Sequence, residues 1–366
     1  MKINGKKYHS VWKLDDDSDT VVIIDQRFLP HQLIFEELDS SEKVAVAIEE
    51  MHLRGAPLIG IVAAFGVYYA FKEASSKEEF ASKIERLKNT RPTAINLEWA
   101  IQQQIKLSEE LSDQDKAAIQ SALFENGFKI LHEDIELCRK IGENGLSIIE
   151  EIAAKKPGET INILTHCNAG WLATGDYGTA TSPIYHAHDK GIKVHVYVDE
   201  TRPRNQGARL TAWELSQHGV PHTVIADNTG GHLMQHGLVD VCFVGADRVT
   251  RTGDAANKIG TYLKALAAND NDVPFYVCLP YTTFDFSIRD GVKEIPIEER
   301  GSEEVKLIQG KHNGEVKKVL LTPEDSPAVN YGFDVTPARL VTELVTERGR
   351  CQANEESIMK LYTDHA

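Results

Sequence analysis

Apolar residues recur at intervals of three and four through most of the first 155 residues. This spacing puts apolar side chains on one face of an α-helix. Before the helical region, apolar and polar residues alternate on both sides of an acidic run at residues 15–19, which predicts a β-hairpin. We therefore expect a mainly helical amino-terminal domain with a small hairpin or sheet, covering residues 1–128. The predicted helices cover residues 43–53, 60–74, 77–88, 94–111 and 113–154.

The pattern changes after residues 156–158, where Lys-Pro-Gly interrupts the helical spacing. Short β-rich runs then alternate with segments of helical character, which predicts βαβ units and a parallel sheet covered on both faces. We expect a Rossmann-like domain at residues 129–366 and an α/β protein as a whole. The helix at 113–154 fits either domain, or a link between them. The predicted strands cover residues 161–165, 194–198, 222–226, 241–245 and 275–279.

Length, charge and cysteine content narrow the class of protein. The chain has 366 residues, more than the roughly 250–300 at which one core usually stops growing, so two domains are expected. A net charge of −15 argues against non-specific binding to nucleic acid, whose phosphates would be repelled. Five widely spaced cysteines without a CxxC pair indicate neither a zinc site nor a disulfide framework. With no signal peptide pattern and no run close to ~20 apolar residues, we predict a cytoplasmic protein that binds no membrane.

Two predicted strands are followed directly by potentially reactive side chains. Cys167 lies two residues after the run 161–165, and Asp247 lies two residues after the run 241–245. Ligands of open α/β sheets bind at the carboxyl ends of strands, so this thiol and this carboxylate are candidates for one active site. Each also has an ordinary interpretation, because free cysteines are usually small buried residues and such carboxylates often cap helices or form ion pairs.

Other polar residues are candidates for binding an anionic substrate. Arg54 and Arg91 each precede a predicted helix, where a guanidinium and unbonded N–H groups can bind a phosphate. Asn257 and Lys258 lie where a further helix is predicted to begin, near residue 254, and could bind a sugar phosphate. Gln206 follows the strand at 194–198 and is a candidate ligand for a hydroxyl. Surface arginines, a solvated lysine and a loop held by its own ion pairs are the ordinary interpretations.

The sequence favours neither a metal nor a nucleotide cofactor. His186, His188 and His195 could suggest a metal, but we expect His195 to point from a strand away from the helix that carries the other two. The small-residue loop after Cys167 does not contain the G-x-G-x-x-G pattern of dinucleotide-binding folds.

The motifs together resemble the methylthioribose-1-phosphate isomerases, a family related to the regulatory subunits of initiation factor 2B and to archaeal ribose-1,5-bisphosphate isomerases. The resemblance implies a homodimer that acts on a small sugar phosphate in methionine salvage, without a cofactor. It also implies a catalytic pair, Cys167 and Asp247. The implied substrate-binding residues are Arg54, Gly55, Ala56, Arg91, Gln206, Asn257 and Lys258. The motifs are residues 54–57 (Arg-Gly-Ala-Pro), 91–94 (Arg-Pro-Thr-Ala), 165–170 (Thr-His-Cys-Asn-Ala-Gly), 200–215, 245–248 (Gly-Ala-Asp-Arg) and 253–262.

The implied activity is an aldose–ketose isomerisation of 5-methylthioribose 1-phosphate to 5-methylthioribulose 1-phosphate. The chain departs from the family at residues 330–332, where Asn-Tyr-Gly stands in place of Asn-Pro-Ala, and at Trp171, where a small residue is common. These departures keep a 5-deoxyribose-1-phosphate isomerase of 5-deoxyribose salvage open as an alternative. A non-catalytic binding subunit like those of initiation factor 2B is a third interpretation, which the joint presence of Cys167 and Asp247 disfavours. A ribose-1,5-bisphosphate isomerase would need a further basic cluster for its second phosphate.

Overall fold

The computed structural model describes residues 1–91 and 95–363, which form two compact units. Unit 1 comprises Met1–Phe28, Leu33–Arg139 and Gly170–Gly178. Unit 2 comprises Leu29–Gln32, Lys140–Ala169 and Thr179–Ala366. A single helix, α5 (Lys116–Lys155), contributes residues to both units, and the boundary expected at residue 128 falls inside it.

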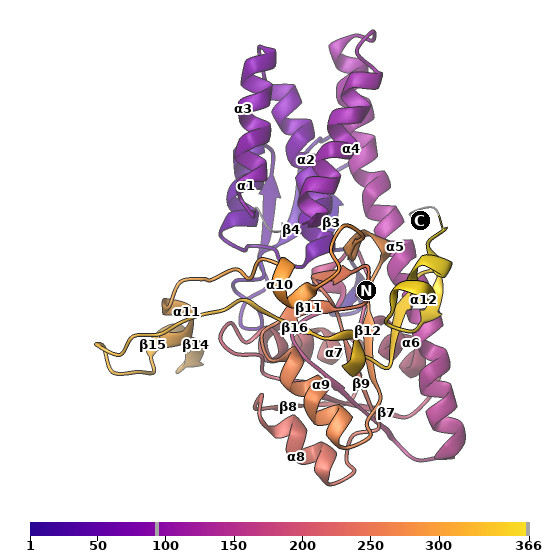
Figure 1. The fold of residues 1–366 in the computed structure, drawn as a ribbon. Helices are drawn as coiled ribbons and strands as arrows, with labels where there is room; N and C mark the ends of the chain where they lie inside the picture. The colour runs from indigo at the N-terminus through magenta and orange to yellow at the C-terminus, as the bar shows by residue number, and fades with distance from the viewer. Residues whose placement is uncertain (92–94, 364–366) are drawn as a thin grey trace. The chain divides into compact units, whose positions relative to one another are not determined.

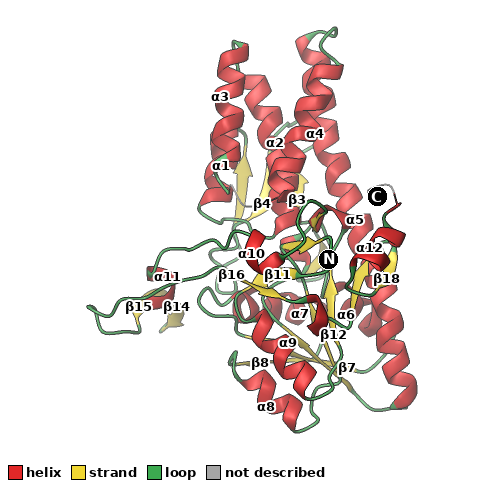
Figure 2. Cartoon of the chain, viewed as in Figure 1, coloured by secondary structure: helices red, strands yellow, loops and turns green. Residues whose placement is uncertain are grey.

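Unit 1 is mainly helical and contains a small antiparallel sheet in the order β3-β4-β5 (Figures 1 and 2). The strand pair β3–β4 is the hairpin predicted around the acidic run, since its strands flank residues 15–19. Each predicted helix of this region is present. The elements are β1 (Lys2–Ile3), β2 (Lys6–Lys7), β3 (Val11–Lys13), β4 (Val21–Ile24), β5 (Phe35–Leu38), α1 (Ser41–Glu49), α2 (Ala56–Glu73), α3 (Lys77–Lys88) and α4 (Ile95–Glu110).

Helix α2 lies at the centre of the unit 1 core. It is long and apolar enough to cross a membrane, but 78% of it is buried inside the fold. Gly60 lets α4 approach closely, because a Cβ at this position would lie 2.7 Å from the carbonyl oxygen of Asn96. Phe65 of α2 packs edge-on against Phe124 and Phe128 of α5. The burial of α2 identifies it as a core helix of unit 1.

Unit 2 is built on a seven-stranded sheet in the order β18-β17-β12-β9-β6-β7-β8, counted over the described residues. All neighbours are parallel except β18, which pairs antiparallel with β17. This confirms the predicted parallel sheet, and all five predicted strands belong to it. The strands are β6 (Ile161–Thr165), β7 (Val194–Asp199), β8 (His222–Ile225), β9 (Val241–Val244), β12 (Phe275–Cys278), β17 (Glu343–Thr346) and β18 (Gly349–Cys351).

A second sheet of unit 2, in the order β13-β10-β11-β16, corrects the expectation for residues 254–261. Asn257 and Lys258 were expected at a helix start, but they lie on strand β11, and the helix begins only at Thr261. The backbone of β11 is hydrogen-bonded on both sides, to β10 and to β16. The strands are β10 (Arg248–Thr250), β11 (Ala255–Lys258), β13 (Phe284–Asp285) and β16 (Phe333–Thr336).

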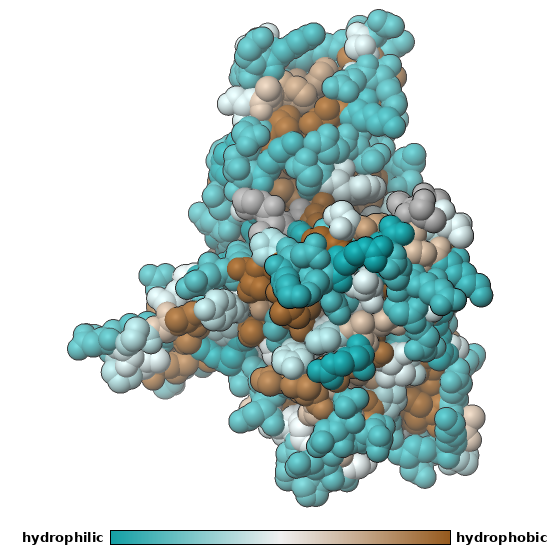
Figure 3. Space-filling view, in the orientation of Figure 1, coloured by the Kyte–Doolittle hydropathy of each residue, from teal (hydrophilic) through white to brown (hydrophobic). Residues whose placement is uncertain are grey.

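Strands β14 (Leu307–His312) and β15 (Glu315–Leu320) form a separate hairpin closed by Asn313 and Gly314, both with positive φ, as two-residue hairpin turns require. Apolar side chains of and after this hairpin are exposed, among them Val319 and Leu321, and Figure 3 shows brown surface among the polar atoms of this arm. The helices of unit 2 are α6 (Ser182–Asp189), α7 (Ala212–His218), α8 (Thr229–Gln235), α9 (Thr261–Asp270), α10 (Gly291–Glu294), α11 (Glu303–Lys306) and α12 (Glu355–Leu361).

Asp134 is a buried carboxylic acid on α5 within unit 1. Its Oδ2 accepts a hydrogen bond from the backbone N–H of Gly175 at 2.6 Å, and burial raises its pKa to about 7. Between pH 4 and 7 the folded protein therefore holds a proton that the unfolded chain has released. The free energy of unfolding must fall as pH rises through this range, by about 1.4 kcal/mol per pH unit, and level off above it.

We expect Asp134→Asn to remove this pH-dependent loss, because an amide oxygen accepts the same hydrogen bond and does not titrate. Urea unfolding midpoints at pH 5, 6, 7 and 8 should show the variant gaining on the wild-type protein as pH rises. Asp113→Asn, which changes an exposed carboxylate of the same unit, is the control and should run parallel to wild type. A constant offset between Asp134→Asn and wild type at all four pH values would contradict the prediction.

Candidate active site

Cys167 lies on a strained turn just after β6. Its φ is +67°, in the left-handed region that residues with a Cβ seldom adopt, and its side chain is buried. Two hydroxyls hold the turn. The Cys167 N–H donates to Thr201 Oγ1 at 2.8 Å, and the Cys167 carbonyl accepts from Thr211 Oγ1 at 2.7 Å. Backbone strain of this kind persists only where the surroundings enforce it, and it is typical of functional sites.

The sheet brings the turns that carry Cys167 and Asp247 to the same edge. Strands β6 and β9 are parallel neighbours, so their carboxyl ends lie side by side. The two turns are also in contact, because a Cβ on Gly245 would lie 2.6 Å from the Cβ of Ala169. Glycine at position 245 is therefore required for the Asp247 turn to pack against the Cys167 turn.

The backbone of Asp247 is hydrogen-bonded to the second sheet. It is partly buried, and its N–H donates to the carbonyl of Ala256 on β11 at 2.9 Å. Asp247 directly precedes β10, whose Arg248 lies opposite Ala256 in the antiparallel pairing with β11, and Ala256 is the neighbour of Asn257. The sheet register thus brings a catalytic candidate beside a substrate-binding candidate.

Asn257 and Lys258 are both buried at the end of β11. Asn257 Nδ2 donates to Thr261 Oγ1 at 3.0 Å. Lys258 Nζ donates to the carbonyl of Gly332 at 2.6 Å and lies 4.5 Å from the centre of the Phe333 ring. Gly332 belongs to the segment in which the sequence departs from the family pattern, so that departure lies directly against Lys258.

Gln206 has the clearest sign of an unfilled role. Its side chain is 3% exposed, and its Oε1 has no hydrogen-bond partner among the described residues. Leaving a buried carbonyl oxygen unbonded costs about 1–3 kcal/mol. Gln206 directly precedes the π-helical turn Gly207–Thr211, and single π-helical turns occur frequently at functional sites.

The loop that carries Gln206 is braced by partly buried ion pairs. Arg204 Nη1 and Arg300 Nη2 each donate to Glu304 Oε1, at 2.6 and 2.8 Å. Burial alone would raise the pKa of Glu304, but the hydrogen bonds and charges of Arg300 and Arg204 lower it to about 2. Arg202 adds a hydrogen bond from Nη2 to the carbonyl of Val305 at 2.6 Å. The loop is therefore fixed before any ligand binds.

The remaining candidates lie in unit 1. Arg54, Gly55 and Ala56 stand at the start of α2, where no side-chain cap is present in the described part of the chain, and Arg91 is partly buried. Gly55 has a φ of +98°, and a Cβ there would lie 2.5 Å from backbone atoms of Ala173. The rest of the second arginine motif, residues 92–94, lies outside the described residues.

Sequence reasoning did not single out the residues that support Cys167. Thr201 and Thr211 are separated from it by 34 and 44 positions, and although both lie in the motif at 200–215, neither was named as a candidate. His166 and Asp199 were visible as polar residues at the ends of buried strands, and their side chains are bonded to each other at 2.8 Å. Their position at the ends of buried strands is the sequence feature that could have identified them as supporting residues.

Two clusters in the described residues have metal-ligand side chains within 4.8 Å of one another, but each already contains a cationic side chain of the protein. In the cluster of His166, Asp199 and Asp227, Lys264 Nζ lies 3.2 Å from Asp199 and also donates to the carbonyl of Asp227. The other cluster is Asp25, Glu36 and His52, where the guanidinium of Arg27 binds both carboxylate oxygens of Asp25.

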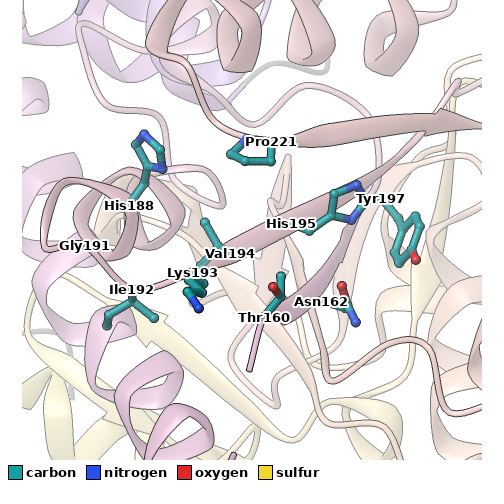
Figure 4. A pocket seen from close by; sticks show the side chains of 10 residues that line it. All are labelled: Thr160, Asn162, His188, Gly191, Ile192, Lys193, Val194, His195, Tyr197 and Pro221. Carbon is teal, nitrogen blue, oxygen red and sulfur yellow. The ribbon is translucent and has the colours of Figure 1, made fainter. Parts of the chain in front are cut away.

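A hollow of about 670 Å³ lies elsewhere on unit 2, at the amino ends of β6 and β7 (Figure 4). His188 and His195 both line it. His195 Nε2 pairs with Thr223 Oγ1 at 3.0 Å, and the three histidines at 186, 188 and 195 are in neither of the metal-type clusters. Because Cys167 follows the opposite end of β6, this hollow is separate from the candidate active site.

Comparisons with known proteins agree with the motifs. Residues 52–353 match the profile of the Initiation factor 2 subunit family. A protein of Sinorhizobium medicae named methylthioribose-1-phosphate isomerase is 56% identical over 368 residues, covering 100% of both chains. One of Desulfatibacillum aliphaticivorans with the same name is 54% identical, covering 100% of this chain and 99% of its own.

Solved structures resemble the whole chain. The 5-methylthioribose 1-phosphate isomerase from Pyrococcus horikoshii OT3 matches with a TM-score of 0.84 and 38% identity, over 98% of this chain and 97% of the other. Translation initiation factor eIF-2B, subunit delta, from A. fulgidus matches with a TM-score of 0.79 and 34% identity, over 98% and 100%. The fold and these matches define an α/β protein of the Initiation factor 2 subunit type. Within that class, the chain belongs to the methylthioribose-1-phosphate isomerase family.

We expect Gly55→Ala to destabilise unit 1 more than Gly5→Ala does. Both glycines have positive φ, so each substitution forces alanine into a sparsely populated backbone conformation that costs about 1–3 kcal/mol. Only at Gly55 does the new Cβ also meet backbone atoms, whereas Gly5 has nothing within 4 Å. Urea unfolding midpoints measure the difference, and equal losses in the two variants would contradict the close approach at Gly55.

Proposed function

We propose that this protein isomerises 5-methylthioribose 1-phosphate to 5-methylthioribulose 1-phosphate in methionine salvage. The observation that carries the proposal is the full-length similarity, at 53–56% identity, to relatives named methylthioribose-1-phosphate isomerase. The site geometry supports it, because a thiol and a carboxylate follow neighbouring parallel strands beside a buried amide and a buried ammonium.

In this proposal Asp247 is the general acid that opens the sugar ring. The phosphate on O1 prevents the ring from opening as a free hemiacetal, so the bond between C1 and the ring oxygen must break directly. Its electron pair goes to the ring oxygen, which takes the proton of Asp247. General acids of this kind contribute roughly 10²–10⁴-fold to the rate.

The hydrogen on C2 must then move to C1 while the C2 hydroxyl becomes a carbonyl. In one route it moves as a hydride to the electron-poor C1, and the hydroxyl proton leaves to a base. In the other route Cys167 takes the C2 hydrogen as a proton, and the resulting enol is protonated at C1. Both routes balance without an oxidant, and in the first the polarisable Cys167 sulfur would stabilise the electron-poor centre.

The remaining site residues would bind the substrate. Arg54 and Arg91 offer paired donors suited to a phosphate, together with the N–H groups at Gly55 and Ala56. Gln206 Oε1, which lacks a protein partner among the described residues, would accept a hydrogen bond from a sugar hydroxyl. Asn257 and Lys258 would contribute an amide and an ammonium at the end of β11.

A second candidate substrate is 5-deoxyribose 1-phosphate. The observation that favours it is the contact between Lys258 and the carbonyl of Gly332, because residues 330–332 differ from the family pattern. The carbonyl of residue 332 is a backbone group that any residue offers, so the changed side chains of this segment would alter the surroundings of the sugar without removing Cys167, Asp247 or the bond of Lys258.

The resemblance further supports a homodimer that works in the cytoplasm without a metal or nucleotide. The five cysteines form no disulfide in the described part of the chain, which fits a reducing compartment. Light scattering on the purified protein would give its mass in solution. A monomeric mass would reject the homodimer and leave the proposed reaction untouched.

The first test is the ratio of kcat/KM for 5-methylthioribose 1-phosphate to that for 5-deoxyribose 1-phosphate, with ketose formation followed without added metal. We expect a preference of at least about tenfold for the methylthio sugar, because burying one extra apolar group is worth roughly 10–200-fold. Equal or reversed values would assign the protein to 5-deoxyribose salvage. Turnover of neither sugar would favour a non-catalytic binding subunit.

Cys167→Ser and Asp247→Asn should each lower kcat by at least about 100-fold. Both changes are small, so thermal unfolding midpoints should stay near the wild-type value. Cys351→Ser and Asp270→Asn are matched controls, which change a partly buried thiol and an exposed carboxylate away from the site and should retain activity. Near-normal turnover in either site variant would remove that residue from its assigned role.

A further inference from the structure

Three ionisable side chains are buried next to the Cys167 turn and have no role in the proposed reaction. They are His166, Asp199 and Lys264, with side-chain exposures of 0%, 0% and 5%. His166 Nδ1 and Lys264 Nζ both face Asp199 Oδ2, at 2.8 and 3.2 Å. Replacing a buried ionic group by well-packed apolar residues is often neutral or stabilising, so stability alone does not explain the cluster.

Both ring nitrogens of His166 have hydrogen-bond partners within the protein. Its Nε2 lies 2.9 Å from the carbonyl oxygen of Ile259, which can only accept, so this nitrogen is the donor. Its Nδ1 lies 2.8 Å from Oδ2 of Asp199. The ring is therefore held from both sides.

The His166 ring connects two parts of the candidate site. In the sequence, His166 directly precedes Cys167. Its ring is hydrogen-bonded to the carbonyl oxygen of Ile259, the residue directly after Lys258. Strand β11, which ends at Lys258, also accepts the N–H of Asp247 through Ala256. A single buried ring thus connects the thiol turn to the strand that carries Asn257 and holds Asp247.

The neighbouring residues are shaped around this ring. A Cβ at Gly260 would lie 2.9 Å from Cε1 of His166, so only glycine leaves room for the imidazole. The carbonyl of Asp199, the partner of His166, accepts from Thr201 Oγ1, which in turn accepts the N–H of Cys167. Asp334 fixes the Gly260 turn from β16, because its Oδ2 accepts the Gly260 N–H at 2.7 Å.

We propose that His166 is a positioning residue, whose buried ring fixes the Cys167 thiol relative to Asp247 and Asn257 through the hydrogen bond to Ile259. This inference rests on the proposed isomerase function, because the separation of these groups matters only if they act on one substrate. Misplacing a reacting group by about 1 Å can lower the rate by roughly 100-fold. The role of His166 is therefore expected in kcat rather than in substrate binding.

Two amide variants test the two hydrogen bonds of the His166 ring one at a time. Gln at position 166 puts an amide N–H near the place of Nε2 and keeps the bond to Ile259, whereas Asn puts one near Nδ1 and keeps only the bond to Asp199. We expect His166→Asn to lower kcat by at least about tenfold with KM nearly unchanged, and His166→Gln to retain most of the activity. His195→Gln, at the other end of the parallel strands, is the matched control and should behave as wild type.

Alkylation of Cys167 by iodoacetamide gives a readout that needs no turnover. Mass spectrometry reports the rate for each cysteine separately, with Cys351 as an internal standard. A turn released from Ile259 should expose the thiol, so the Cys167 rate should rise severalfold in His166→Asn and stay near wild type in His166→Gln.

Equal kcat values for the two amide variants, a change confined to KM, or unchanged alkylation in both variants would overturn the proposal. Activity losses that merely follow the thermal unfolding midpoints would overturn it too. If the wild-type protein turns over neither sugar phosphate, the proposed function fails, and alkylation alone then decides whether His166 positions the Cys167 turn.

Discussion

The left-handed backbone at Cys167 is the constraint on which the rest of the candidate site depends. A residue with a Cβ pays about 1–2 kcal/mol for this conformation, so it must be held from outside. Thr201 binds the N–H of Cys167 and Thr211 binds its carbonyl, so the two peptide units that flank the residue are both held. Each threonine has an unusual backbone of its own: Thr201 has a φ of +63°, and Thr211 ends a π-helical turn. Strain at one residue is thus spread over three segments that meet only in the folded sheet.

The parallel sheet could be predicted because its strands are short apolar runs that end in glycine or polar residues. The second sheet could not, since its strands are brief and carry no such run. The sequence Ala-Ala-Asn-Lys at 255–258 contains good helix formers, and local propensity favoured a helix there. In the fold its backbone groups bond to β10 and β16 instead, and this tertiary pairing overrides a preference of a few tenths of a kcal/mol per residue.

The site residues also divide into those that a local sequence pattern identifies and those that only tertiary contacts identify. Cys167 and Asp247 stand out because their side chains are reactive and directly follow strands. The supporting hydroxyls of Thr201 and Thr211 are common residue types whose importance comes from distances that the sequence does not contain. The unit boundary was equally hidden, because α5 runs through it without a break, and only tertiary contacts assign residues 170–178 to unit 1.

A chain of net charge −15 whose proposed substrate is a phosphate ester must separate its local from its overall electrostatics. At physiological ionic strength, exposed charges more than about 8 Å away are largely screened, so the acidic surface has little effect on a bound substrate. Buried charges are screened much less. Lys258 is buried at the end of β11, so its ammonium acts on a nearby phosphate more strongly than distant surface carboxylates do, while the surface charge slows only the approach of the substrate.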